Sequence, residues 1–147
     1  MFGNDSGDGS KSIISEEVAK EQFASFLEYF DIDFNDIEIE DGVEAAKTMK
    51  NTLVRAIERG ALEISTGEEL VIRQVLSRPI GEITVITYTD KVAKARLAMD
   101  HESPKKTQAR IYAFMAALSD MPTSQLMKLK GADLSVFDRL TAIFSMV

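Results

Sequence analysis

Strand-forming residues are confined to one short stretch of this chain, and this confinement limits the possible folds more than any other feature. Residues 62–88 contain three segments rich in Val, Ile, Leu and Thr, at 62–65, 69–76 and 82–88. Thr66-Gly67 supplies the first turn, and Pro79 is expected to end the second segment because it has no amide to donate. Three strands need a helix over one face to be stable. We therefore expect a small antiparallel meander covered by helices.

Helical periodicity occupies the chain on both sides of this meander. Before it, apolar residues recur at helical spacing over 16–30 and over 43–59, with Ser15 as the cap of the first helix and Gly60 just after the second. After it, we expect a cluster of about four helices. Their predicted positions are 91–100 with Asp90 as cap, 104–119 after Ser103-Pro104, 123–129, and a last helix capped by Asp133 and carrying Leu134 to Phe144.

Residues 31–41 (DIDFNDIEIED) interrupt the helical pattern. Ile37 and Ile39 alternate with acids, as in a strand, so we expect an edge strand or an extended connector here. The run of acids also suggests a calcium loop, but that loop needs Gly at its sixth position and Glu at its twelfth. Counted from Asp31, these positions hold Asp36 and Gly42, so we expect no metal site.

These patterns predict an α+β fold. Residues 1–12 read as a flexible polar tail, because Gly, Ser, Asp and Asn dominate them. Residues 13–147 then form a single domain of ordinary size. Within it we expect an acidic helical front at 13–60, the β-meander at 61–89 and a helical C-terminal part at 90–147.

The residues needed for most catalytic chemistry are scarce. The chain has no Cys and a single His, which excludes thiolate nucleophiles, disulfides and Cys- or His-rich metal sites. That histidine, His101, lies between Asp100 and Glu102 in a connector, where an exposed turn residue is the usual role. No Walker loop, GxGxxG or GxSxG motif is present. We therefore expect no catalytic residues, no cofactor and no enzymatic activity.

Charge is distributed unevenly along the chain. Residues 1–50 contain 4 Lys/Arg and 13 Asp/Glu, whereas residues 51–147 contain 13 Lys/Arg and 11 Asp/Glu. Such asymmetry suits head-to-tail self-association or a basic partner. Six cations cluster around the two helices expected at 91–119: Lys91, Lys94, Arg96, Lys105, Lys106 and Arg110. They leave a nucleic-acid partner open as a weaker alternative, against the overall acidity of the chain. No apolar stretch is long enough to cross a membrane, so we expect no membrane partner.

The C-terminal third contains the string MAALSDMPTSQLMKLKGADLSVFDRLTAIF, at 115–144. Its informative positions are Leu118-Ser119, Met121, Leu126, Leu129, Ala132-Asp133, Phe137, Leu140 and Phe144. At these positions the string resembles the ending of bacteriophage tail assembly chaperones. The meander, with Leu76 to Ile80 and the strand at 83–88, resembles the β-part of the same proteins, so the resemblance covers about residues 60–147. Asp120 departs from the pattern, since the family often has Gly there.

The resemblance implies a non-catalytic protein of the host cytoplasm. Such chaperones coat the tape measure protein and help recruit tail tube subunits, and they often form homo-oligomers. Methionine side chains suit adaptable binding surfaces, although filling a core is their commoner role. We expect the partner protein to contact the C-terminal helices through Met115, Met121, Leu126, Met127, Phe137 and Phe144. The main alternative is a structural tail or baseplate subunit that stays in the particle.

Overall fold

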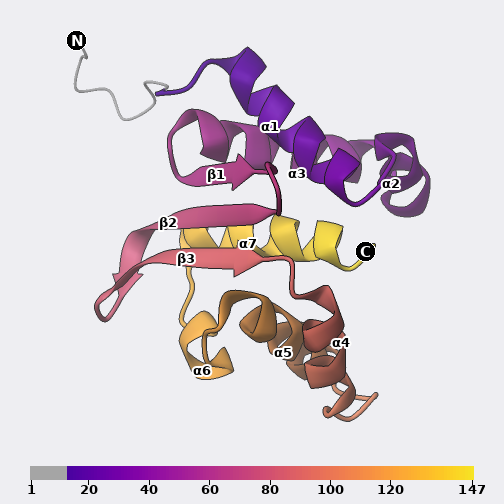
Figure 1. Ribbon diagram of the computed structural model, residues 1–147, viewed down its shortest axis with the longest axis vertical. Coiled ribbons are helices and arrows are strands. Elements are labelled where there is room, and N and C mark those ends of the chain that lie inside the picture. Colours follow the sequence, from indigo (N-terminus) through magenta and orange to yellow (C-terminus); the bar gives the residue numbers. More distant parts are fainter. Residues whose placement is uncertain (1–12) are drawn as a thin grey trace.

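The computed structural model describes residues 13–147, and it confirms the predicted α+β fold (Figure 1). The predicted polar tail at 1–12 lies outside the described residues. Three helices precede a three-stranded sheet, and four follow it. In chain order the elements are α1 (Glu16–Tyr29), α2 (Phe34–Asp41), α3 (Val43–Glu58), β1 (Leu62–Ser65), β2 (Val71–Ile80), β3 (Ile83–Thr89), α4 (Val92–Asp100), α5 (Thr107–Ser119), α6 (Thr123–Leu126) and α7 (Gly131–Phe144).

The sheet is the predicted antiparallel meander, with strand order β1-β2-β3. Ile64 pairs with Ile72, and Gln74 pairs with Ile86. Successive side chains alternate between a buried and an exposed face along β1 and the first half of β2. Helix α7 passes behind β2 and β3 in Figure 1, so helices cover one face of the sheet and the other faces solvent. This one-sided covering explains why the strands read as alternating apolar and polar residues.

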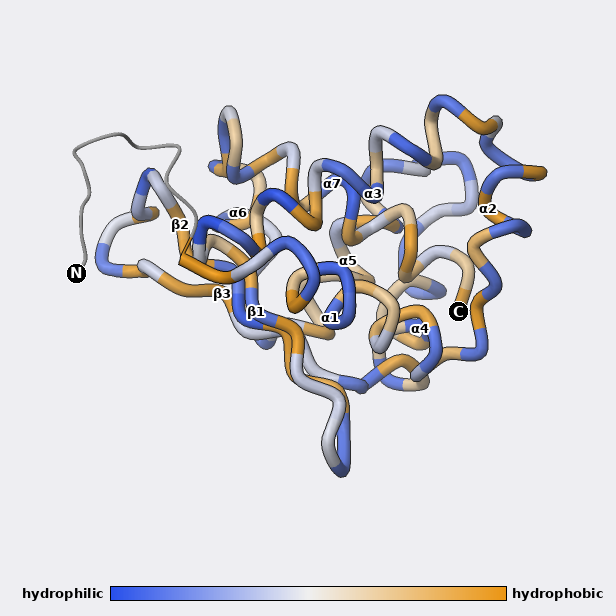
Figure 2. Tube along the Cα trace, turned by 90° about the horizontal axis from the view of Figure 1, so that it is seen from above, coloured by the Kyte–Doolittle hydropathy of each residue, from blue (hydrophilic) through white to orange (hydrophobic). Residues whose placement is uncertain are grey.

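Aromatic side chains join the first and last helices into one core. Phe144 of α7 lies 5.4 Å from Phe26 and 5.8 Å from Phe30, measured between ring centroids. Phe114 of α5 lies 6.5 Å from the same ring. Each such pair contributes about 0.5–1.5 kcal/mol beyond the area that it buries. In Figure 2, which looks from above, α3 and α7 lie side by side on the same side of the sheet. The acidic front and the helical C-terminal part therefore fold against each other.

A buried chain of hydrogen bonds ties α7 to the sheet. The Tyr88 hydroxyl of β3 donates to Gln74 Oε1 at 2.8 Å, and Gln74 Nε2 donates to the Asp133 carbonyl at 2.8 Å. The Asp133 carboxylate in turn accepts from the Ser77 amide at 2.9 Å and from the Arg78 amide at 3.0 Å. The Ser77 hydroxyl donates to it as well, at 3.2 Å. Gln74 and Asp133 are the only buried polar or charged residues in the part of the chain that the structure describes, and each has partners.

The prediction of a strand or connector at 31–41 was wrong, because residues 34–41 form helix α2. The Asp33 carboxylate caps this helix by accepting from the Asn35 amide at 2.9 Å. Phe34 and Ile37, three residues apart, turn toward the core, and Ile37 is fully buried. The alternation of Ile37 and Ile39 was misleading because these two side chains lie on opposite sides of a helix.

The predicted break of the second strand at residues 77–79 was also wrong, because β2 continues to Ile80. The pairing with β3 is irregular between Val75 and Ile80, so the strand carries a bulge there. Pro79 lies in this bulge, where its missing amide breaks no regular pairing. Strand β2 continues through the bulge because the Asp133 carboxylate accepts the amides of Ser77 and Arg78.

Some predicted helix boundaries are confirmed and others are displaced. Ser15 caps α1 as expected, with the Val18 amide donating to its hydroxyl, and Gly60 has the expected left-handed conformation at φ +77°. Asp90, however, accepts from the Tyr29 hydroxyl and does not cap α4, whose preceding residue is Lys91. Helix α5 begins at Thr107, three residues after the predicted start at Pro104, and α6 ends at Leu126 rather than at 129. Helix α7 begins at Gly131, so Asp133 lies inside it and not at its cap.

Replacing Asp133 with alanine should lower the free energy of unfolding by about 3 kcal/mol. The substitution removes the charged acceptor of two part-buried amides, those of Ser77 and Arg78, and a hydrogen bond to a charged group contributes about 1.5–3 kcal/mol. Urea unfolding followed by circular dichroism measures the change. Asp41→Ala is the matched control at an exposed aspartate, with an expected change within about 0.5 kcal/mol. Equal effects of the two substitutions would contradict this account of Asp133.

Burial raises the pKa of Tyr88 far above the usual value of about 10. Below pH 10 this hydroxyl is protonated in both the folded and the unfolded chain, so its contribution to stability is fully present. Above pH 10 the unfolded chain loses the proton first, and the free energy of unfolding should fall by about 1.4 kcal/mol per pH unit from this group. Urea unfolding at several alkaline pH values should give a smaller slope for Tyr88→Phe than for the unmodified protein. Identical slopes would show that Tyr88 ionises normally.

Candidate protein-binding site

Four of the six side chains predicted to contact a partner are buried inside this chain. They are Met115, Leu126, Phe137 and Phe144, each with at most 1% of its surface exposed. Met121 is partly buried against the same core, and only Met127, 68% exposed at the end of α6, offers a surface. The structure therefore uses the apolar stripe of the C-terminal helices for packing. A role for these residues in binding stays a prediction, but four of them have no surface for a partner in this conformation.

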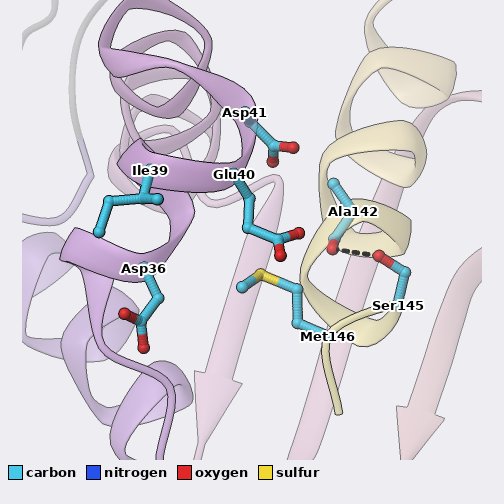
Figure 3. A pocket seen from close by; sticks show the side chains of 7 residues that line it. All are labelled: Asp36, Ile39, Glu40, Asp41, Ala142, Ser145 and Met146. Atoms are coloured by element: carbon cyan, nitrogen blue, oxygen red, sulfur yellow. Dashed lines mark hydrogen bonds between the residues drawn. The ribbon is translucent and has the colours of Figure 1, made fainter.

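A groove of about 630 Å³ lies between α2 and the end of α7. Asp36, Ile39, Glu40 and Asp41 line it from α2, and Ala142, Ser145 and Met146 line it from the α7 side. In Figure 3, Glu40 and Asp41 point toward α7, the Met146 side chain lies opposite Glu40, and Asp36 and Ile39 lie farther from α7. The Ser145 hydroxyl donates to the Ala142 carbonyl at 2.7 Å, which keeps it turned toward its own helix.

Two large apolar side chains, on α2 and just after it, are exposed to solvent among acidic residues. Ile39 is 81% exposed, and Val43 at the start of α3 is 60% exposed. Figure 2 shows hydrophobic and hydrophilic segments alternating along α2 at the outer margin of the molecule. We call Asp36, Ile39, Glu40, Asp41 and Val43 the α2 surface. Protein-binding surfaces have an apolar centre and a polar rim, and the α2 surface contains both kinds of residue.

The charge of this region is not neutralised within the described residues. Positions 31–44 contain seven carboxylates and no Lys or Arg. None of the seven forms an ion pair with a described residue, although five such pairs occur elsewhere in residues 13–147. The nearby cation Lys50 lies over the Phe34 ring, 5.4 Å from its centroid. The α2 surface therefore keeps a negative potential that attracts a cationic partner.

The polar groups near the groove are few and exposed. Among residues 13–147, no group of three or more His, Asp or Glu side chains is placed to hold a metal ion. The groove carboxylates Asp36, Glu40 and Asp41 are exposed to water. His101 is exposed at the end of α4. What the α2 surface can do is bind apolar and cationic groups together.

The predicted basic cluster lies on α4, on α5 and in their connection, and it is partly paired. Lys91 and Lys94 both contact the Asp120 carboxylate, and the hydrogen bond and charge of Lys91 lower the pKa of Asp120. Arg110 lies 3.6 Å from Asp100. Arg96 donates to the carbonyl of Val147. These contacts leave fewer cations for phosphate groups than the sequence suggested.

Comparison of the chain with protein-family profiles, with curated proteins and with solved structures finds no match. The resemblance of residues 60–147 to tail assembly chaperones thus stays an expectation from the sequence. Within the described residues, no helix is both long enough and apolar enough to span a membrane.

Sequence reasoning missed the α2 surface because it treated residues 31–41 as extended. Two signals in the sequence could have found it. Asp33 followed by acids is typical of a helix start, and Phe34 and Ile37 have helical spacing. With α2 read as a helix, Ile39 falls on the side opposite Ile37, where it must face solvent.

Proposed function

We propose that this protein is a non-catalytic assembly factor that binds another protein through the α2 surface. The observation that carries the proposal is the 81% exposed Ile39 within a stretch of seven carboxylates, none of which forms an ion pair with a described residue. Exposing a large apolar side chain without a partner is unfavourable, and an uncompensated run of like charge is as well. A partner with an apolar residue flanked by cations covers the exposed side chain and neutralises the carboxylates.

The resemblance of residues 60–147 directs the proposal to phage tail assembly. The protein is then a tail assembly chaperone that holds the tape measure protein and helps recruit tail tube subunits. We place its client contact on α2 rather than on the C-terminal helices, because the apolar stripe of those helices is buried in the core. A long helical client supplies apolar stripes with basic residues beside them, and such a stripe fits the α2 surface.

The chemistry of the α2 surface suits reversible binding. Exposed charges at the rim of an interface mainly speed association, and they are screened by salt. The apolar centre of an interface, which becomes buried on binding, supplies most of the affinity. On the α2 surface this centre consists of Ile39 and Val43 alone. A contact with so small an apolar centre is held weakly and released readily. A chaperone that leaves its client when the tube closes needs this property.

Ile39→Lys should lower capture of the tape measure protein about tenfold or more, because it replaces the apolar centre with a charge of the wrong sign. Met127→Lys is the matched control, since Met127 is an exposed apolar residue of the helices predicted from sequence. Co-expression of each variant with tagged client, followed by affinity capture and quantification, measures the effect. A loss with Met127→Lys and none with Ile39→Lys would place the contact on the C-terminal helices and overturn the α2 assignment.

The chaperone should be absent from finished particles. Mass spectrometry of purified particles and of assembly intermediates tests this directly, with the tail tube protein as the internal reference. We expect peptides of this chain in the intermediates only. Recovery from finished particles in a fixed ratio to the tube protein would instead identify a structural subunit.

A further inference from the structure

Helix α4 carries the counterpart of the α2 surface. Leu97 is 66% exposed, and with Ile39 it is one of the two most exposed large apolar residues within the helices of residues 13–147. Lys94 stands one helical turn before Leu97, and Arg96 stands next to it. We call Lys91, Lys94, Arg96 and Leu97 the α4 surface. One helix therefore presents an exposed isoleucine among acids, and another presents an exposed leucine among bases.

The α4 surface keeps a positive charge after its own ion pairs are counted. Lys91 and Lys94 share the single carboxylate of Asp120, so one of the two charges stays uncompensated. Lys105 and Lys106, in the connection to α5, form no ion pair with a described residue. Opposite potentials thus face solvent at α2 and at α4, as complementary interfaces require.

The two surfaces lie on either side of the end of α7. The groove at α2 includes Ser145 and Met146, and a small cavity of about 140 Å³ beside α4 includes Arg96, Ser145 and Val147. Figure 1 shows the C-terminal end of the chain between α2 and α4, and Figure 2 agrees. Among the described residues, no ion pair or side-chain hydrogen bond joins α2 to α4, so one copy does not bring its own two surfaces together.

We propose that the α2 surface is covered by the α4 surface of a second copy of this chain, in a two-fold dimer. Because both surfaces flank the same helix end, a two-fold axis beside that end brings α2 of each copy against α4 of the other. The contact is then made twice and the assembly closes at two copies. Ile39 of one copy packs against Leu97 of its partner in each contact, within a rim of opposite charges.

The dimer proposal rests on the proposed function and adds a way in which client binding is regulated. The second copy occupies the α2 surface until a client takes its place, so free chaperone does not expose Ile39 to unwanted partners. Client binding and dimerisation then compete for one surface. Opening the dimer in advance should raise client capture, because the client no longer has to displace a subunit.

Sedimentation velocity ultracentrifugation over a range of concentrations and salt tests the dimer. The unmodified full-length protein should dimerise with rising concentration, and more weakly at high salt. Ile39→Lys and Leu97→Glu should each raise the dissociation constant about tenfold or more. An equal mixture of the two variants should dimerise again. One contact in the mixed dimer is unmodified, and the other places the introduced lysine opposite the introduced glutamate.

Val18→Lys and Val18→Glu, at an exposed residue of α1, are the matched controls and should dimerise like the unmodified protein. Circular dichroism and thermal unfolding establish that every variant is folded, which is expected because all the positions are exposed. A protein that stays monomeric at every concentration overturns the proposal. So does a dimer that neither substitution weakens, or a mixture that stays monomeric.

Leu97→Glu separates this proposal from the proposed function, because it leaves the α2 surface intact. If both hold, this variant is monomeric and captures more tape measure protein than the unmodified chain. A monomeric unmodified protein that captures client through Ile39 overturns the dimer alone. A dimer that obeys the mixing test while no variant captures client overturns the proposed function alone.

Discussion

The carboxylate of Asp133 is the contact on which the arrangement of the sheet and the last helix depends. It is 4% exposed, and three donors from β2 converge on it. Its own carbonyl accepts from Gln74, which in turn accepts from Tyr88. Hydrogen bonds have a strict geometry, whereas apolar contacts tolerate sliding. This chain of polar contacts therefore fixes the register of α7 on a sheet whose other contacts are mostly apolar.

The position of α7 determines where the two exposed surfaces lie. Phe144 near its end packs against rings of α1 and α5, so the end of α7 is held between the front and the back of the molecule. The α2 surface and the α4 surface lie on either side of it. A small shift of α7 along the sheet would change the separation between them. The buried polar chain and the interaction surfaces are therefore parts of one arrangement.

The sequence predicted the class of the fold and most element positions, because long apolar periodicity and clear turns determine them. The sequence was least informative where a residue contacts partners that are far away along the chain. Asp133 reads locally as a helix cap, and only the folded chain brings it to Ser77, 56 positions away. Asp90 likewise binds Tyr29 across 61 positions. Pro79 stops a regular strand, but the bulge in which it lies depends on that remote carboxylate.

The candidate contacts show a similar limit. An apolar stripe predicts that a helical face is covered, but it does not tell whether the cover comes from the same chain. Met115 and Phe137 are covered from within. Ile39 was overlooked because two isoleucines separated by one acid look like a strand, and eight residues are too few to display a helical repeat clearly.

The bulge in β2 has a consequence for how the folded protein resists aggregation. Strand β1 pairs with β2 only as far as Gln74, so the later part of β2 has no neighbouring strand on that side. Pro79 has no amide to offer there, and the amides of Ser77 and Arg78 are already held by a side chain. An incoming strand from another molecule finds no row of donors to join. This part of the sheet margin is thereby closed to the template-like pairing that leads to fibrils.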